Sequence, residues 1–241
     1  MGKHSKNIKN NVGRQMRDVN LADIDGIELT AFEFIEKCED ARHYIHSQRD
    51  YGRVVRDPRG YSNIKKLKDE IIPISLYLQY LRHIGNDLEK LKIIWKKGNQ
   101  KGDAQIFDGK WLMLEVTTAR HQNEYLVRHR VNQSGGSFTA DGLTKTNSGI
   151  ESKPVVLDYG VNVKRYYAWV CEQIAKKSEG YRGGTIRLIV HVIQDGLILD
   201  SEIDDIEKHF SSFKLPGNIE HVFISFGDRK KFILIKNNNN T

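Results

Sequence analysis

The chain has few of the residues that stabilise small domains by crosslinking, since its 241 residues include two cysteines and four prolines. Two cysteines by themselves form neither a disulfide framework nor a zinc knuckle, and we expect a reducing, cytoplasmic environment. No apolar run approaches the ~20 residues that cross a bilayer. The basic N-terminus also lacks the apolar stretch of a secretory signal. We therefore expect a cytoplasmic protein with no membrane partner.

Several catalytic signatures are also missing. The sequence contains no G-x-G-x-x-G or Walker pattern, which argues against dinucleotide and P-loop chemistry, and no G-x-S-x-G nucleophile elbow. Its nine histidines show no H-E-x-x-H or Cys/His spacing, so we expect no zinc. With 39% hydrophobic and 29% charged residues, the composition is that of an ordinary globular protein.

The net charge of +7 is unevenly distributed. Residues 1–20 carry five basic side chains and one acidic side chain, whereas the remainder of the chain is close to neutral. A basic tail attracts polyanions, but a solvated, disordered end has the same composition. Total charge is therefore weak evidence for a nucleic-acid partner.

Periodicity predicts an α/β protein, or α+β sandwich, with a helical N-terminal region. We expect a disordered basic tail at 1–20, a helical region at 21–73, an α/β core at 74–236 with a flexible loop at 132–154, and a disordered Asn-rich end at 237–241. Helices are predicted over 29–49, 74–95, 161–177 and 200–213, and strands over 104–107, 111–117, 186–192, 197–199, 221–226 and 231–236.

The most informative stretch is a predicted hairpin over residues 103–117. Leu112, Leu114 and Val116 alternate with polar or larger residues and should face the core. A three-residue turn at 108–110 keeps these side chains on the buried face, whereas a two-residue turn mixes polar and core positions on one face. The three-residue turn also places Asp103 opposite Glu115, so we predict two carboxylates as cross-strand neighbours.

Two adjacent carboxylates repel one another, and a positive group between them relieves that repulsion. Oxygen-only ligands favour Mg²⁺ or Mn²⁺. The alternative is that both acids lie exposed at the hairpin end, in contact with solvent or with Lys101 and Lys110.

These residues resemble the PD-(D/E)xK superfamily of restriction-endonuclease-like nucleases. That family has an acid in one strand, followed in the next strand by an acid, any residue and usually Lys. Asp103 and the run Glu115-Val116-Thr117 fall into this frame. The predicted order of helix, hairpin, helix and strand agrees with it over about residues 74–236. The resemblance implies a central mixed sheet flanked by helices.

Two positions depart from the family pattern. Gly102 stands where Pro is usual, and Thr117 stands where Lys positions the attacking water and stabilises charge on the phosphate. A hydroxyl can orient water but supplies no charge. Lys101, opposite Thr117 in the predicted register, is the first candidate replacement, followed by Lys153 and Lys164.

The resemblance implies metal-assisted phosphodiester hydrolysis, with Asp103 and Glu115 holding Mg²⁺ or Mn²⁺. Glu89 matches an additional acid that some family members contribute from the preceding helix, and Gln105 is placed to bind a phosphate or a water. For nucleic-acid contacts the predicted residues are Arg120, Arg128, Arg130, Lys145 and Lys153.

The sequence therefore predicts a Mg²⁺-dependent nuclease that acts on double-stranded DNA in a restriction, defence or mobile-element setting and that can form a homodimer. A catalytically inactive nucleic-acid-binding protein on the same fold is one alternative. An interaction or assembly protein that binds no nucleic acid is the other.

Overall fold

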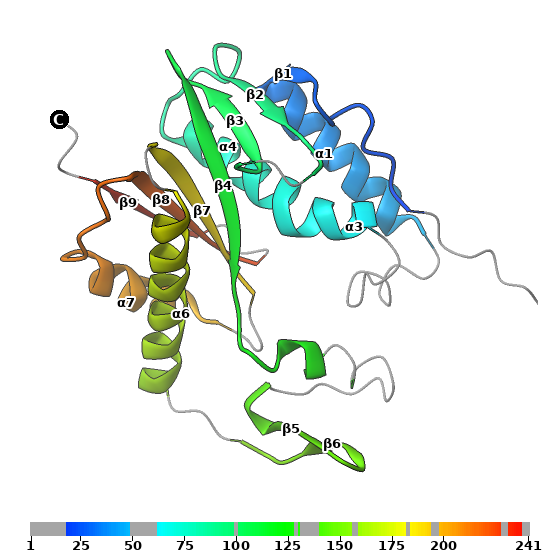
Figure 1. Ribbon diagram of the computed structural model, residues 1–241, viewed down its shortest axis with the longest axis vertical. Helices are drawn as coiled ribbons and strands as arrows, with labels where there is room; N and C mark the ends of the chain where they lie inside the picture. The colour runs from blue at the N-terminus through cyan, green and yellow to red at the C-terminus, as the bar shows by residue number, and fades with distance from the viewer. Residues whose placement is uncertain are drawn as a thin grey trace, which may run out of the picture.

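A seven-stranded mixed sheet forms the centre of the molecule (Figure 1). The structure is a computed structural model that describes residues 18–48, 62–98, 101–127, 130, 140–155, 159–181, 184–193, 198–227 and 231–237. In spatial order the strands are β1 (Glu28–Thr30), β2 (Lys92–Trp95), β3 (Ala104–Phe107), β4 (Trp111–Ala119), β7 (Ile186–Val192), β8 (Ile219–Phe226) and β9 (Phe232–Lys236). Strand β7 is parallel to both β4 and β8, and the other neighbouring pairs are antiparallel.

Helices cover both faces of this sheet, and each face has its own hydrophobic core. One core contains side chains from α1 (Ala31–His46), α3 (Ser62–Lys66), the π-helical turn η1 (Leu67–Ile71) and α4 (Ile72–His83). The opposite core contains side chains from α6 (Tyr159–Gly180) and α7 (Asp200–Phe210). Strand β7 is almost entirely buried, as expected of a parallel strand between two helical layers. The chain is thus a mixed α/β protein with helices on both faces of one sheet.

The predicted hairpin register is confirmed. Phe107 pairs with Trp111, Gln105 with Met113, and Ala104 with Leu114. The turn between the strands closes with a hydrogen bond from the backbone N–H of Asp108 to the carbonyl of Lys110 (3.0 Å). Burial of one face of β4 selected this register, because a shift of one residue would expose the entire apolar set.

The predicted helix over 74–95 is wrong in its second half. Helix α4 ends at His83, and Gly85 follows with a left-handed φ of +93°, a conformation that glycine adopts at helix C-termini. The chain then returns as β2, in which Ile93 and Trp95 alternate into the core. Helical and strand spacing are hard to distinguish in a short apolar run, and the glycine decides the boundary here.

Two further boundaries differ from expectation. Residues 198–199 belong to no strand; the N–H of Leu199 instead donates to Glu202 at the start of α7 (2.7 Å). The segment predicted as a flexible loop over 132–154 contains a short 3₁₀ turn, η2 (Ala140–Gly142), and an antiparallel hairpin of β5 (Leu143–Thr146) and β6 (Gly149–Ser152). Residues 132–139 lie outside the described part of the chain.

The ends of the described chain are held by specific contacts. Val19, within the predicted tail, is buried, and the Asp18 carboxylate accepts hydrogen bonds from the first backbone N–H groups of α3. At the other end, the Asn237 side chain donates to the carbonyls of Pro216 and Ile219. Side-chain hydrogen bonds therefore fix both Asp18 and Asn237 to the rest of the fold.

Candidate functional site

Asp103 and Glu115 meet where β3 begins beside β4. The backbone N–H of Asp103 donates to the carbonyl of Leu114 (3.0 Å), which continues the hairpin pairing by one residue. The Asp103 side chain turns toward β4, and its Oδ2 accepts a hydrogen bond from the backbone N–H of Val116 (2.8 Å). This carboxylate thus caps the edge of β4 at the point where β3 no longer pairs with it. The predicted proximity of the two acids is present.

The ionisation of Asp103 reflects that proximity. Burial and the Glu115 carboxylate raise the pKa of Asp103 from 3.8 to about 6, with a smaller contribution from Glu70. The hydrogen bond from Val116 and the charge of Lys177 lower the same pKa, but they do not offset the rise. The site therefore concentrates negative charge in a poorly solvated position, which is the arrangement that a cation relieves.

Glu115 is held by two groups from the C-terminal end of α6. Its side chain is only 8% exposed; Oε1 accepts from the Lys177 ammonium and Oε2 from the Tyr181 hydroxyl. Burial and the Glu115 carboxylate raise the pKa of Tyr181, so its phenol remains a donor. The same hydroxyl oxygen accepts from the backbone N–H of Gly102 (2.8 Å). Tyr181 therefore links Glu115 to the segment that carries Asp103.

Lys177 supplies the positive charge that Thr117 cannot. None of the expected replacements takes this place: Lys101, Lys153 and Lys164 are exposed, whereas Lys177 contacts Glu115 directly. The Thr117 hydroxyl instead donates to Oε1 of Gln173, one helical turn before Lys177 (3.0 Å). The lysine that contacts Glu115 is thus distant from it in sequence and is brought to the strand by α6, whereas a role for Lys101 stays a prediction.

One face of α6 carries four side chains that contact β4 or the segment after it, and we call this row the polar ladder. Lys177, Gln173, Trp169 and Arg165 recur every four residues and share one face of the helix. Beyond the Lys177 and Gln173 contacts, the Trp169 ring lies 5.7 Å from the ring of His121, which follows β4. Arg165 then donates to Asp141 at the base of the β5–β6 hairpin (2.6 Å). This ladder fixes the phase of α6 relative to the acids.

The additional acid near the site is Glu70, not Glu89. Glu89 lies exposed in the turn after α4, with its N–H donating to Asp87, so its predicted helical position is wrong. Glu70 lies in η1, where it accepts from the Trp95 indole (3.1 Å) and pairs with Lys66. Its charge contributes to the raised pKa of Asp103, which places it within electrostatic reach of that acid. No sequence signal distinguished Glu70 from the neighbouring Asp69.

Gly102 adopts a backbone conformation that a proline could not adopt. Its φ of +76° lies in the left-handed region, which proline cannot enter. A Cβ at this position would also lie 2.4 Å from Cγ of Met113 and 3.2 Å from the carbonyl oxygen of Leu114. The absence of a side chain allows the segment before Asp103 to approach β4 closely.

The other predicted residues lie outside this cluster. Gln105 is exposed on β3, and Lys145 and Lys153 are exposed on and beside the β5–β6 hairpin. Arg120 is partly exposed and lies 3.7 Å from Glu124, and Arg130 is half-buried. Arg128 falls outside the described residues. The structure brings none of the five described residues into contact with Asp103 or Glu115.

The donor set fits a hard divalent cation bound through few protein ligands. Asp103 and Glu115 offer carboxylate oxygens, and Mg²⁺ commonly uses one or two carboxylates and retains several waters. Within the described residues no group of three or more His, Cys, Asp or Glu side chains is arranged to hold a metal ion. Any cation here would thus depend on this carboxylate pair and on water.

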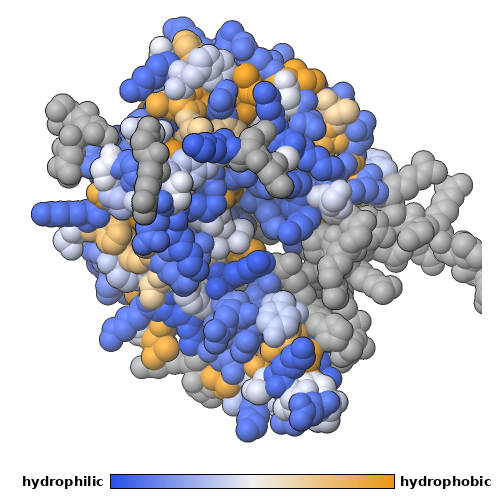
Figure 2. All heavy atoms as spheres, viewed as in Figure 1, coloured by the Kyte–Doolittle hydropathy of each residue, from blue (hydrophilic) through white to orange (hydrophobic). Residues whose placement is uncertain are grey.

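The face of the molecule shown in Figure 2 is mainly hydrophilic. Figure 2 shows polar side chains over most of this face, with apolar side chains only in small groups. No helix in the described part of the chain is long and apolar enough to cross a membrane. Comparison with family models, curated proteins and solved structures yields no match to this chain.

Proposed function

We propose that this protein is a nuclease that uses Mg²⁺ or Mn²⁺ to hydrolyse phosphodiester bonds of DNA at the Asp103–Glu115 site. The proposal is carried by one arrangement, in which two carboxylates lie across a hairpin and the Lys177 ammonium contacts one of them. An acid pair with an adjacent lysine is the residue set that the resemblance to restriction-endonuclease-like nucleases implies.

The order of elements supports the same proposal. Helix α4 precedes β2 and the β3–β4 hairpin, α6 follows the hairpin, and β7 returns parallel to β4. This is the succession of helix, hairpin, helix and strand on which the resemblance rests. Glu115 lies on β4, the strand that contacts both η1 and α6, and Asp103 lies just before β3.

Each residue has a distinct task in the proposed reaction. A bound Mg²⁺ lowers the pKa of a coordinated water and polarises the phosphate. Asp103 and Glu115 would hold that ion, and Tyr181 orients Glu115 by donating to it. Lys177 provides the fixed positive charge that would stabilise the charge developing on the phosphate. Thr117 and Gln173 position the helical turn that carries this lysine.

The proposal is tested by removing one charge at a time from the carboxylate pair. We expect Asp103→Asn and Glu115→Gln each to lower Mg²⁺-dependent cleavage by at least about 10²-fold, the usual cost of losing a catalytic electrostatic contact. Plasmid and single-stranded DNA are the substrates, with EDTA as the metal-free arm. Glu89→Gln, an exposed acid outside the site, is the matched control and should retain full activity. Undiminished cleavage in both acid variants would rule the assignment out.

Adjacent lysines on α6 provide a second test. Lys177→Met should lower cleavage by about 10²-fold because it removes the only ammonium that contacts Glu115 among the described residues. Lys176→Met is the control, since Lys176 is exposed and pairs with Glu172. Initial cleavage rates and melting temperatures should be measured together. Equal rates in the two variants would show that Lys177 has no part in the reaction.

A non-catalytic nucleic-acid-binding protein remains the second candidate, and one observation favours it. Both oxygens of Glu115 are already engaged, by Lys177 and by Tyr181. An acid that is permanently neutralised in this way would stabilise the fold without binding a metal. Salt-dependent DNA binding with no cleavage in Mg²⁺ or Mn²⁺ is the result that this alternative predicts.

A further inference from the structure

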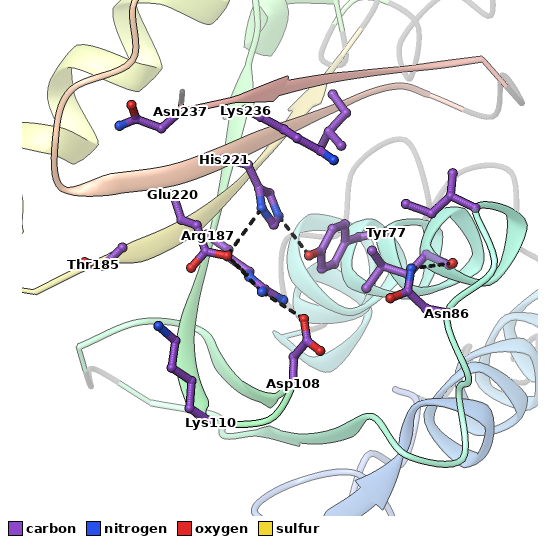
Figure 3. A pocket seen from close by; sticks show the side chains of 13 residues that line it. Tyr77, Asn86, Asp108, Lys110, Thr185, Arg187, Glu220, His221, Lys236 and Asn237 are labelled. Atoms are coloured by element: carbon purple, nitrogen blue, oxygen red, sulfur yellow. Dashed lines mark hydrogen bonds and ion pairs between the residues drawn. The ribbon is translucent and has the colours of Figure 1, made fainter. Parts of the chain in front are cut away.

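A second cluster of polar groups lines a cavity on the α4 side of the sheet (Figure 3). The cavity has a volume of about 710 Å³ and lies where β7 and β8 begin. Its walls come from α4, the β3–β4 turn, β7, β8 and β9. Glu115 is held instead by residues of α6, which covers the opposite face. The cavity is therefore separate from the proposed nuclease site.

The floor of the cavity is a fixed network around Arg187. This guanidinium, 9% exposed, donates from Nη2 to Asp108 (2.9 Å) and from Nε and Nη2 to the same oxygen of Glu220 (3.0 and 2.9 Å). One guanidinium thus bridges both carboxylates and offsets one of their two negative charges. Such a network holds its shape before any ligand arrives, which lowers the entropic cost of binding.

His221 and Tyr77 complete the floor. Nε2 of His221 shares a hydrogen bond with the Tyr77 hydroxyl (2.8 Å), while Nδ1 lies 3.9 Å from Glu220, beyond hydrogen-bond distance. Burial, Arg187 and Lys236 together lower the pKa of His221 to about 3, so the imidazole is neutral.

The rim determines the charge of a suitable ligand. Lys110 and Lys236 are exposed and extend from different sides of the Arg187–Glu220 pair (Figure 3). Within the described residues neither ammonium forms an ion pair with an acid. Together with Arg187, these two ammoniums give the cavity three positive charges against the two negative charges of Asp108 and Glu220, a formal net charge of +1. They favour an anion over a cation.

The volume and the lining of the cavity indicate the size and polarity of a suitable ligand. A cavity of this volume falls within the range of roughly 300–1,000 Å³ that holds organic ligands, so an inorganic anion alone would leave most of it unfilled. Leu81, Ile84 and Leu234 provide an apolar wall. The complementary ligand thus combines an apolar or aromatic body with an anionic end.

We propose that this cavity binds a nucleoside phosphate, with its phosphate at the rim that carries Lys110 and Lys236 and its base against the wall of Leu81, Ile84 and Leu234. Lysine ammonium groups bind phosphate as point charges, and the neutral His221 offers a further polar contact. The inference depends on this cavity alone and stands independently of nuclease activity.

The test is calorimetric titration of the full-length protein in EDTA with AMP, adenosine and inorganic phosphate. AMP should bind saturably and at least about tenfold more tightly than either fragment, because only AMP uses both the ammonium rim and the apolar wall. A Lys110→Ala/Lys236→Ala variant should weaken AMP binding by at least about tenfold. A Lys90→Ala/Lys176→Ala variant, which removes two exposed lysines elsewhere, should leave it unchanged.

Two further readouts keep the proposal falsifiable. AMP should shift the imidazole NMR signals of His221, and Ile84→Ser should weaken AMP binding while leaving inorganic phosphate unaffected. No saturable AMP binding up to about 2 mM, equal affinity for AMP and phosphate, or an unchanged affinity in the rim variant would each overturn the proposal. Cleavage of DNA is measured separately, so failure here leaves the nuclease proposal untouched.

Discussion

At the scale of single residues, the ionised form of Asp103 that would bind a cation also lowers the stability of the folded protein. Its pKa of about 6 exceeds the ordinary value of 3.8, so the folded protein holds this proton more tightly than the unfolded chain. The resulting contribution to stability is fully present below about pH 4 and is lost as the pH rises through 6. Above pH 6 the folded protein carries a poorly solvated charge, which is the state that would bind a cation.

Asp103→Asn should therefore stabilise the metal-free protein while abolishing cleavage. Asparagine keeps an acceptor for the N–H of Val116 but carries no charge. In EDTA at pH 8 we expect the free energy of unfolding to rise by an amount on the order of 2–3 kcal/mol. At pH 4 the gain should disappear, because Asp103 is then protonated in the fold. Urea denaturation at both values checks this, and a gain that does not vary with pH would contradict it.

At the scale of elements, the close approach of the segment before β3 to β4 depends on Gly102. Gly102→Ala combines a strained φ with a clash against Met113 and the backbone of Leu114. Gly109→Ala is a matched control, since its φ of +72° is similar and nothing lies within 4 Å of an added Cβ.

Both variants should lose roughly 1 kcal/mol from the strained backbone. Gly102→Ala should lose about 1–3 kcal/mol more, because the neighbouring chain must move. It should also slow cleavage by displacing Asp103. Urea denaturation compares the two, and equal losses would show that the close approach has no energetic role.

The hairpin was predictable from sequence, whereas its partners were not. The alternation of Leu112, Leu114 and Val116 is local information, and it was enough to place Asp103 opposite Glu115. Lys177 could not be assigned in the same way, because its contact depends on how α6 is rotated against the sheet. The apolar stripe of Val163, Tyr166, Val170 and Ile174 shows which side of α6 faces the sheet, but it does not show which polar neighbour reaches Glu115. Likewise, Glu89 fitted a helical pattern that the turn at Gly85 ends.

At the scale of the whole molecule, one sheet separates two chemically different places. Leu114 and Glu115 of β4 are paired with Arg187 and Leu188 of β7. Glu115 belongs to the carboxylate site on the α6 side, and Arg187 to the cavity on the α4 side. Adjacent residues of the central strands thus serve opposite faces, since side chains alternate across a sheet. A ligand in the cavity and a cation at the carboxylates would both contact side chains of the paired strands β4 and β7.

The elements that flank β4 differ in their distance from it along the sequence. Its β3 partner is reached through a turn of three residues, whereas β7 and α6 come only after the long connection from residue 120 onward. Contacts between nearby residues form sooner, because less chain entropy is lost in closing them. We expect the nascent hairpin to hold Asp103 and Glu115 together before α6 has docked. Folding would then assemble the repelling pair first, and arrival of Lys177 would be the late event that neutralises it.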